Sequence, residues 1–169
     1  MSNSLLVIGG ARSGKSRYAQ ARAEASGLKP VFIATAQAFD GEMRDRIARH
    51  QADRGPEWET VEAPLDLPRA IAAHGAPDRV LLVDCLTLWV SNLMLAGQDV
   101  GQAAGALVEA LTAAEGLVVL VSNEVGWGIV PDNALARRFR DEAGFVNQGV
   151  AAAAGEVQMV VAGLPLRLK

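Results

Sequence analysis

Gly9-Gly10-Ala11-Arg12-Ser13-Gly14-Lys15-Ser16 is the stretch of this sequence that decides the fold. It has the form G-x-x-x-x-G-K-[ST], which is typical of a P-loop, a turn that holds phosphate groups with its backbone N–H groups. The apolar run Leu5-Leu6-Val7-Ile8 before it predicts a buried strand, and residues 16–24 after it predict a helix. This strand–loop–helix context favours a P-loop over a glycine-rich turn that only joins two elements.

Each part of the motif has an expected task. Gly9 and Gly14 allow backbone angles and close approaches that a side chain would block. Successive N–H groups at a helix N-terminus attract an anion. Lys15 is expected to act as a catalytic group on the β- and γ-phosphates of a nucleotide, and the Ser16 hydroxyl is expected to bind Mg²⁺. The predicted phosphate-binding residues are Gly9, Gly10, Ala11, Arg12, Ser13, Gly14, Lys15 and Ser16.

The composition predicts one soluble domain over residues 1–169. Hydrophobic residues make up 50% of the chain and the net charge is −3, which argues against a non-specific nucleic-acid binder with its basic excess. A single cysteine, Cys85, excludes an internal disulfide and favours the reducing cytoplasm. We see no signal peptide and no apolar run near the roughly 18 residues of a spanning helix. Peripheral membrane association stays open.

Strand-like and helix-like segments alternate along the chain. Further strands are predicted at residues 30–34, 58–62, 80–84, 117–121, 157–162 and 166–168. Helices are predicted at residues 39–52, 66–74, 86–96, 100–114 and 134–154. This alternation predicts an α/β fold, with a mainly parallel sheet, helices on both faces and an antiparallel C-terminal edge. We place residues 122–133 in a loop, and Gly163 and Pro165 in the turn between the last two strands.

Asp84 is the second strong signal. Ligands of open α/β sheets bind at the carboxyl ends of the strands, and Asp84 follows the four apolar residues 80–83. Such a Walker-B-like carboxylate would bind Mg²⁺ directly or through water. The alternative is an acid that caps the next helix, since Asp is a good N-cap. The P-loop favours the metal role. The neighbouring Cys85 is expected to be a small buried residue.

His50 allows two interpretations from the residues alone. It shares a predicted helix face with Met43 and Ile47, as a half-buried core histidine would. A neutral imidazole is also a competent nucleophile toward phosphorus. The cations around it are equally ambiguous, because they can pair with Asp45 and Asp53 or neutralise a triphosphate. These cations are Arg44, Arg46, Arg49 and Arg54.

Other polar residues give weaker signals. His74 ends a predicted helix, where a protonated imidazole complements the helix dipole, and we interpret it as structural. Arg137, Arg138 and Arg140 begin the last long helix and can bind a substrate phosphate, contact a neighbouring subunit or face solvent. The sequence contains no zinc-ligand spacing and no Ser-His-Asp arrangement.

A set of segments spread over the chain carries a specific likeness. They read G-G-A-R-S-G-K-S-R at residues 9–17, I-A-T-A at 33–36 and N-E-V-G-W-G-I-V-P at 123–131. Further matching positions are Glu42, Met43, Arg46, Ile47, His50, Trp58, Thr60, Glu62, Phe139, Arg140, Asp141, Gly144, Val146, Asn147 and Gln148. Together they resemble the bifunctional adenosylcobinamide kinase / adenosylcobinamide-phosphate guanylyltransferase family of cobalamin biosynthesis. A P-loop alone is shared by many proteins, whereas the combined set is specific.

The resemblance implies two reactions. The first moves the γ-phosphate of ATP or GTP to the aminopropanol hydroxyl of adenosylcobinamide. The second moves GMP from GTP to the new phosphate, through a histidine–GMP intermediate at the position of His50, and gives adenosylcobinamide-GDP. The resemblance also implies a RecA-like fold and a homotrimer with active sites between subunits. The GTP contacts that it implies are Ala34, Thr35, Ala36, Gln51, Ala52, Asp53, Arg54, Glu62 and Asp84.

Two other functions stay open on the sequence. One is a P-loop small-molecule kinase without nucleotidyl transfer, in which His50 would be structural. The other is a non-catalytic RecA-like module whose assembly is controlled by nucleotide. The sequence does not decide between ATP and GTP as the phosphate donor. The loop at residues 124–133 and the three arginines of the last long helix are candidate corrinoid contacts.

Overall fold

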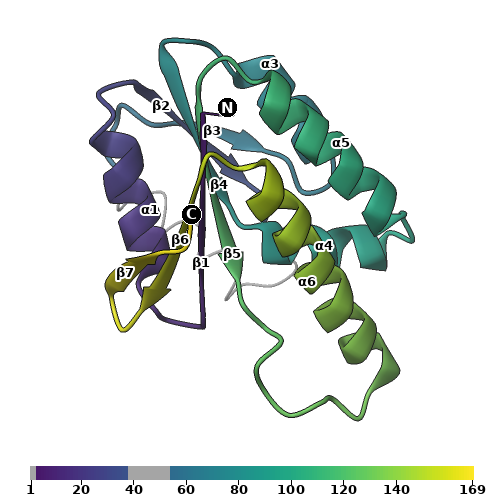
Figure 1. The fold of residues 1–169 in the computed structure, drawn as a ribbon. Coiled ribbons are helices and arrows are strands. Elements are labelled where there is room, and N and C mark those ends of the chain that lie inside the picture. Colours follow the sequence, from purple (N-terminus) through teal and green to yellow (C-terminus); the bar gives the residue numbers. More distant parts are fainter. Residues whose placement is uncertain (1–2, 38–53) are drawn as a thin grey trace.

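A mainly parallel sheet forms the centre of the molecule (Figure 1). The computed structural model describes residues 3–37 and 54–169, and within these the sheet has seven strands in the order β3-β2-β4-β5-β1-β6-β7. Every neighbouring pair is parallel except β6 and β7, as predicted. The strands are β1 (Ser4–Gly9), β2 (Lys29–Ala34), β3 (Glu59–Glu62), β4 (Arg79–Asp84), β5 (Leu117–Asn123), β6 (Glu156–Val161) and β7 (Leu164–Arg167).

The helices cover both faces of this sheet, as predicted (Figure 1). One face carries α1 (Lys15–Glu24). The other carries α3 (Leu67–His74), α4 (Leu86–Leu95), α5 (Val100–Ala113) and α6 (Ala134–Ala153). The helix predicted at residues 39–52 lies outside the described residues. Within the described ranges, no helix has the length and apolar character needed to cross a membrane.

The central strands β1, β4 and β5 contain continuous apolar runs because both of their faces are covered. Side chains alternate between the two sides of a strand. In β1, Leu5 and Val7 pack into the cluster beneath α1, whereas Leu6 packs into the cluster beneath the other helices. The central strands β4 and β5 alternate in the same way. Burial on both sides therefore explains the continuous apolar runs in the sequence.

β5 extends two residues further than the sequence predicted. Ser122 and Asn123 were expected in the loop, but they continue the ladder and pair with Ile8 and Gly9 of β1. Both have short polar side chains, which are depleted in strands. Pairing with β1 decides their conformation, and this pairing joins positions that are far apart in the sequence.

The turn of the C-terminal hairpin also differs from the prediction. Pro165 was placed in the turn, but it lies in β7 opposite Val160. β7 is the edge strand of the sheet, where a residue without an N–H group is tolerated. The turn itself consists of Ala162 and Gly163, which both have positive φ, 52° and 79°. Two left-handed residues are the usual connection of a two-residue hairpin.

Candidate active site

The carboxyl ends of the strands bring several predicted site residues together. Ala34 at the end of β2 lies opposite Glu62 of β3 on one side and Asp84 of β4 on the other. The P-loop follows β1, whose last residue pairs with the last residue of β5. Residues from five neighbouring strands therefore meet along this edge, as the rule for open α/β sheets predicts.

Neither of the two outer glycines of the P-loop can take a side chain without strain. A Cβ on Gly9 would stand 2.6 Å from both the Ser13 hydroxyl oxygen and the Val160 carbonyl oxygen. Gly14 has φ 93°, and a Cβ there would stand 3.2 Å from the Cα of Gly163. These positions confirm the expected need for glycine. Gly10 differs, because a Cβ would meet nothing within 4 Å.

The C-terminal hairpin braces the P-loop from outside. The N–H of Gly163 donates to the carbonyl of Ser13 over 2.7 Å. The same turn residue packs on Gly14, and Val160 of β6 lies against both Gly9 and Gly14. The sequence alone did not suggest this contact, because it joins the two ends of the described chain.

Lys15 begins α1 and turns back over the loop. Its ammonium group donates to the Gly10 carbonyl over 3.0 Å, and its side chain is buried. Burial lowers the pKa of Lys15, while the nearby Asp84 carboxylate acts to raise that pKa. The first turn of α1 has no acidic residue and no side-chain cap. Its N-terminus therefore keeps the positive character that binds phosphate.

Asp84 does not cap the helix that follows it. The N-cap position of α4 is Cys85, whose side chain makes no capping hydrogen bond. Asp84 is therefore not the N-cap residue of α4. Asp84 is half-buried at the end of β4, near enough to Lys15 to influence its charge. Cys85 is buried as expected, and burial raises the pKa of its thiol to about 11, so the thiol is protonated and unreactive at neutral pH.

Thr35 lies behind this edge rather than on it. Its side chain is fully buried, and its hydroxyl makes two hydrogen bonds to the backbone of Cys85. Ala34 is buried and Ala36 is half-buried, whereas Glu62 is exposed. Asn92 of α4 also contacts this segment and was not among the predicted residues. The signal for it in the sequence is the one amide side chain in a mainly apolar helix, L-T-L-W-V-S-N-L-M-L.

The end of β5 is tied to the P-loop. The N–H of Glu124 donates to the Gly9 carbonyl over 3.0 Å, and the N–H of Asn123 donates to the Thr87 hydroxyl over 2.7 Å. In the described part of the chain, three buried side-chain polar atoms have no hydrogen-bond partner, and two of them are the Ser13 hydroxyl and the Asn123 amide oxygen. Buried polar atoms are normally paired, so this edge has capacity for a polar ligand.

Arg54 is the described member of the second predicted group. Its guanidinium group lies 3.4 Å from the centre of the Phe32 ring, and the residue is buried. Stacking on an aromatic ring is a favourable arrangement for a guanidinium. The rest of the group, His50, Gln51, Ala52 and Asp53, lies outside the described residues.

The loop after β5 presents large apolar side chains to solvent. Trp127, Ile129 and Val130 have exposed fractions of 77%, 97% and 60%. At its far end, Asn133 caps α6 by accepting from the N–H of Ala136, and Arg137 donates to the carbonyls of Pro131 and Asp132. The loop is therefore fixed at both ends, while its apolar residues stay uncovered within the described structure.

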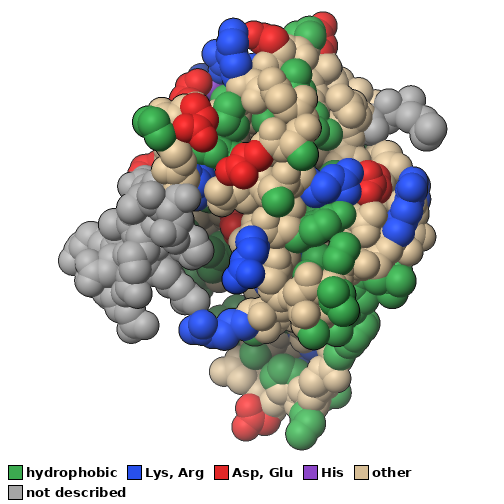
Figure 2. Space-filling view, turned by 90° about the vertical axis from the view of Figure 1, so that its left-hand side faces the viewer, with side chains coloured by type: hydrophobic (Ala, Val, Ile, Leu, Met, Phe, Trp, Pro, Cys, Tyr) green, Lys and Arg blue, Asp and Glu red, His purple; other side chains and the backbone are tan. Residues whose placement is uncertain are grey.

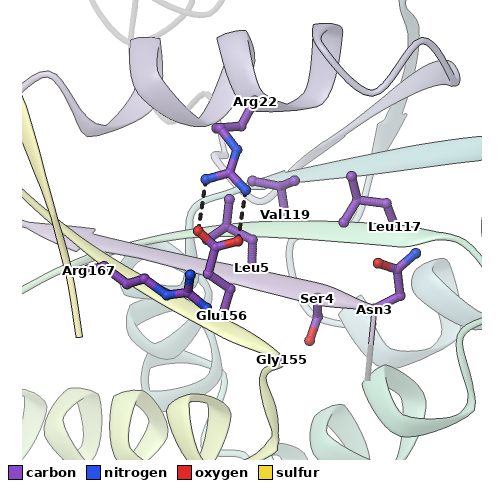
Figure 3. A pocket seen from close by; sticks show the side chains of 9 residues that line it. All are labelled: Asn3, Ser4, Leu5, Arg22, Leu117, Val119, Gly155, Glu156 and Arg167. Carbon is purple, nitrogen blue, oxygen red and sulfur yellow. Dashed lines mark hydrogen bonds and ion pairs between the residues drawn. The ribbon is translucent and has the colours of Figure 1, made fainter. Parts of the chain in front are cut away.

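The opposite, amino end of the sheet has a cleft of about 380 Å³ in which charges are already paired (Figure 3). Arg22 of α1 binds both carboxylate oxygens of Glu156 at 2.8 and 2.9 Å. The pair raises the pKa of Arg22 and lowers that of Glu156 to about 2. The Tyr18 hydroxyl accepts a further hydrogen bond from Arg22. No sequence pattern indicated this pair, because 134 residues separate its members.

The sheet, the loop after β1 and the acid at the end of β4 define a P-loop nucleotide-binding domain of the RecA-like class. Solved structures agree on the fold. The flagellar accessory protein FlaH from Methanocaldococcus jannaschii matches with a TM-score of 0.53 and 10% identity, over 99% of this chain and 79% of FlaH. A prototypical ATPase from the type III secretion system of pathogenic bacteria matches with a TM-score of 0.52 and 9% identity, over 98% of this chain and 57% of the ATPase.

The chain belongs to the cobinamide kinase / cobinamide phosphate guanyltransferase family, whose model matches residues 5–168. It is 49% identical to the bifunctional adenosylcobalamin biosynthesis protein CobP of Pseudomonas aeruginosa, over 97% of this chain and 96% of that protein. It is 45% identical to the bifunctional adenosylcobalamin biosynthesis protein CobU of Escherichia coli, over 98% and 99% of the two chains. The chain is therefore an enzyme, and the resemblance inferred from its motifs is confirmed.

Proposed function

We propose that this enzyme performs two successive reactions on adenosylcobinamide in the cytoplasm, where ATP and GTP are available. It phosphorylates the aminopropanol hydroxyl with ATP or GTP, and it then transfers GMP from GTP to the new phosphate. The product is adenosylcobinamide-GDP. The observation that carries the proposal is the cradle formed by Gly9 and Gly14, with Lys15 and Asp84 beside it. Membership of the cobinamide kinase / cobinamide phosphate guanyltransferase family supports the choice of a cobinamide substrate.

In the first reaction, the substrate hydroxyl oxygen attacks the γ-phosphorus of the nucleotide. The bond from that phosphorus to the β–γ bridging oxygen breaks, a nucleoside diphosphate leaves, and the hydroxyl proton passes to solvent. Lys15 would leave the Gly10 carbonyl and bind the β- and γ-phosphates. The N–H groups at the start of α1 would hold the phosphates in place. Such fixed positive groups stabilise charge in the transition state.

The oxygen donors at this edge fit Mg²⁺. Ser16 supplies a hydroxyl and Asp84 a carboxylate, and hard oxygen ligands of this kind suit a magnesium ion that also binds phosphates. The P-loop, in which Gly9 and Gly14 pack closely on the protein, lies beside these donors. When bound, Mg²⁺ supplies positive charge to the phosphate oxygens. Ser16 and Asp84 are the residues that would hold it.

In the second reaction, an imidazole nitrogen of His50 attacks the α-phosphorus of GTP, and pyrophosphate leaves. The phosphate oxygen of the corrinoid then attacks the same phosphorus, the P–N bond breaks, and His50 is regenerated. This two-step course predicts ping-pong kinetics for the guanylyl transfer. The GTP contacts proposed for it are Ala34, Thr35, Ala36, Gln51, Ala52, Asp53, Arg54, Glu62 and Asp84.

The loop at residues 124–133 is the proposed contact for the corrinoid. It begins beside Gly9, exposes Trp127 and Ile129, and ends at the arginines of α6. Apolar side chains suit the faces of a large ring system, and Arg138 and Arg140 suit the phosphate that the first reaction adds.

A homotrimer is the proposed assembly. The hairpin of β6 and β7 leaves an apolar surface uncovered, and Figure 2 shows hydrophobic side chains gathered there at the right of the view. Val161, Leu164, Leu166 and Leu168 are each more than half exposed. A sheet edge of this kind readily pairs with another chain. Light scattering is expected to give three times the chain mass of 17.7 kDa, and Leu166→Lys is expected to lower it.

The experiment that tests the proposal separates the two reactions. The enzyme is incubated with GTP labelled at the α-phosphate and Mg²⁺. We expect label on the protein that is stable to alkali and labile to acid, as a P–N bond is. His50→Ala should abolish it, and His74→Ala is the matched control because the chain has two histidines. His50→Ala should still phosphorylate adenosylcobinamide from γ-labelled ATP. If the protein stays unlabelled under conditions that support the kinase reaction, the guanylyl transfer is contradicted, and the enzyme is a kinase without nucleotidyl transfer.

A further inference from the structure

One buried hydroxyl holds the backbone directly after Asp84. The pairing of β2 with β4 ends at Ala34 and Asp84. Beyond that point the Thr35 hydroxyl donates to the Cys85 carbonyl over 2.7 Å and accepts from the Cys85 N–H over 2.8 Å. Its own N–H donates to the Asp84 carbonyl over 3.4 Å. Thr35 therefore extends the ladder past its last regular pair and fixes the peptide on which the Asp84 side chain stands.

A buried amide holds Thr35 in turn. The Asn92 side chain of α4 is 7% exposed, and its NH₂ group donates to the Thr35 carbonyl over 2.8 Å and to the Pro64 carbonyl over 3.0 Å. Pro64 comes two residues after Glu62, at the end of β3. One amide therefore ties the segments that follow β2 and β3, and through Thr35 it also ties the end of β4.

These contacts indicate that Thr35 and Asn92 act on the backbone around the site rather than on a substrate. The hydroxyl, N–H and carbonyl of Thr35 are all engaged by the protein, and its side chain is fully buried. Resemblance placed Thr35 among the GTP contacts, but its hydroxyl is directed at the backbone beside Asp84. Groups that orient metal-binding carboxylates commonly lie one layer behind them.

We propose that Thr35 and Asn92 are positioning residues that hold the Asp84 carboxylate in the orientation that binds the magnesium ion of the nucleotide. The inference rests on the magnesium–nucleotide site of the proposed function. It assigns Thr35 an effect on the metal rather than on the nucleotide, and it gives Asn92 a part in the same site.

The test uses Thr35→Val, which keeps the shape and removes the hydroxyl, and Thr35→Ser, which keeps the hydroxyl. Binding of the fluorescent nucleotide mant-ADP is titrated with Mg²⁺ and separately in EDTA, so that no turnover is involved. We expect Thr35→Val to raise the Mg²⁺ concentration for half-maximal binding by about tenfold. Affinity in EDTA should not change, and Thr35→Ser should restore the wild-type value. Thr112→Val on α5 controls for the same substitution at an exposed threonine with a 2.8 Å hydrogen bond.

Other outcomes overturn the inference. If Thr35→Val weakens mant-ADP binding equally with Mg²⁺ and in EDTA, Thr35 is a nucleotide contact. If Thr35→Val leaves the Mg²⁺ concentration for half-maximal binding unchanged, Thr35 has no positioning role. If Thr35→Val does not fold, Asn92→Ser breaks the second link and must show the same selective effect on Mg²⁺. Wild-type binding that ignores Mg²⁺ also contradicts the inference, whatever the His50 labelling shows. Failure of that labelling alone leaves the magnesium result standing.

Discussion

The two ends of the sheet treat their polar groups in opposite ways. At the amino end, Arg22 and Glu156 satisfy one another through two short hydrogen bonds (Figure 3). At the carboxyl end, the Ser13 hydroxyl and the Asn123 amide oxygen are buried without partners, and a lysine rests on a backbone carbonyl. Paired charges stabilise the fold, whereas unsatisfied groups leave capacity for a ligand. The difference separates a structural ion pair at one end from a candidate ligand site at the other, although both ends contain a basic side chain.

The largest expected effect comes from removing the lysine at the carboxyl end. Lys15→Ala should lower kcat of the kinase reaction by roughly a hundredfold to a thousandfold, because one preorganised positive group is lost from the transition state. Lys29→Ala, which removes an exposed lysine at the start of β2, is the matched control and should retain activity. Steady-state rates with γ-labelled ATP measure both. A wild-type rate for Lys15→Ala would contradict the catalytic role assigned to Lys15 at the carboxyl end of the sheet.

A smaller effect is expected from a side chain on the P-loop. Gly14→Ala forces an L-residue to adopt φ 93° against Gly163, which should cost about 1–2 kcal/mol of folding free energy and weaken nucleotide binding. Gly10→Ala is the matched control, since its Cβ would meet open space. Urea unfolding and mant-ADP titration give the two readings. Equal losses in the two variants would contradict the geometry assigned to the loop.

The smallest effect is expected at the amino end. Arg22→Ala should lower the free energy of unfolding by about 1 kcal/mol, because the Arg22 side chain is 37% exposed and partly screened, and kcat should stay unchanged. A changed kcat would contradict the division between the two ends.

The pH dependence of that loss checks its cause. The pKa of Glu156 falls from 4.5 to about 2 on folding. The stabilisation is therefore present above pH 4.5 and disappears as pH falls towards 2. The difference between wild type and Arg22→Ala should shrink over that range. A difference that is constant with pH would point to lost packing instead of the ion pair.

The sequence predicted what depends on local patterns. Strands buried on both faces are apolar runs, and a P-loop has glycines at fixed positions, so Gly9, Gly14 and the order of strands and helices were within reach. The end of β5 could not be predicted in this way, because Ser122 and Asn123 join the sheet through their pairing with β1. The direction of the Thr35 side chain was equally hidden, since its partner, the Cys85 backbone, is fifty positions away. Long-range pairing decides each of these features.

The site around His50 is the part that the structure leaves as a prediction. His50, Gln51, Ala52 and Asp53 lie outside the described residues, so their roles rest on the resemblance and on the labelling experiment. Arg54, the described neighbour, is buried and stacks on Phe32 of β2. Arg54 therefore lies against the face of the sheet that α1 covers.

The brace between Gly163 and Ser13 has a consequence for how the protein matures on the ribosome. The P-loop is synthesised well before the turn that holds it and before the β6 strand that pairs with β1. Nascent chains that still lack residue 163 have the complete P-loop motif without its support. Nucleotide binding is therefore expected to appear only after residue 163 has been synthesised and the hairpin of β6 and β7 has formed.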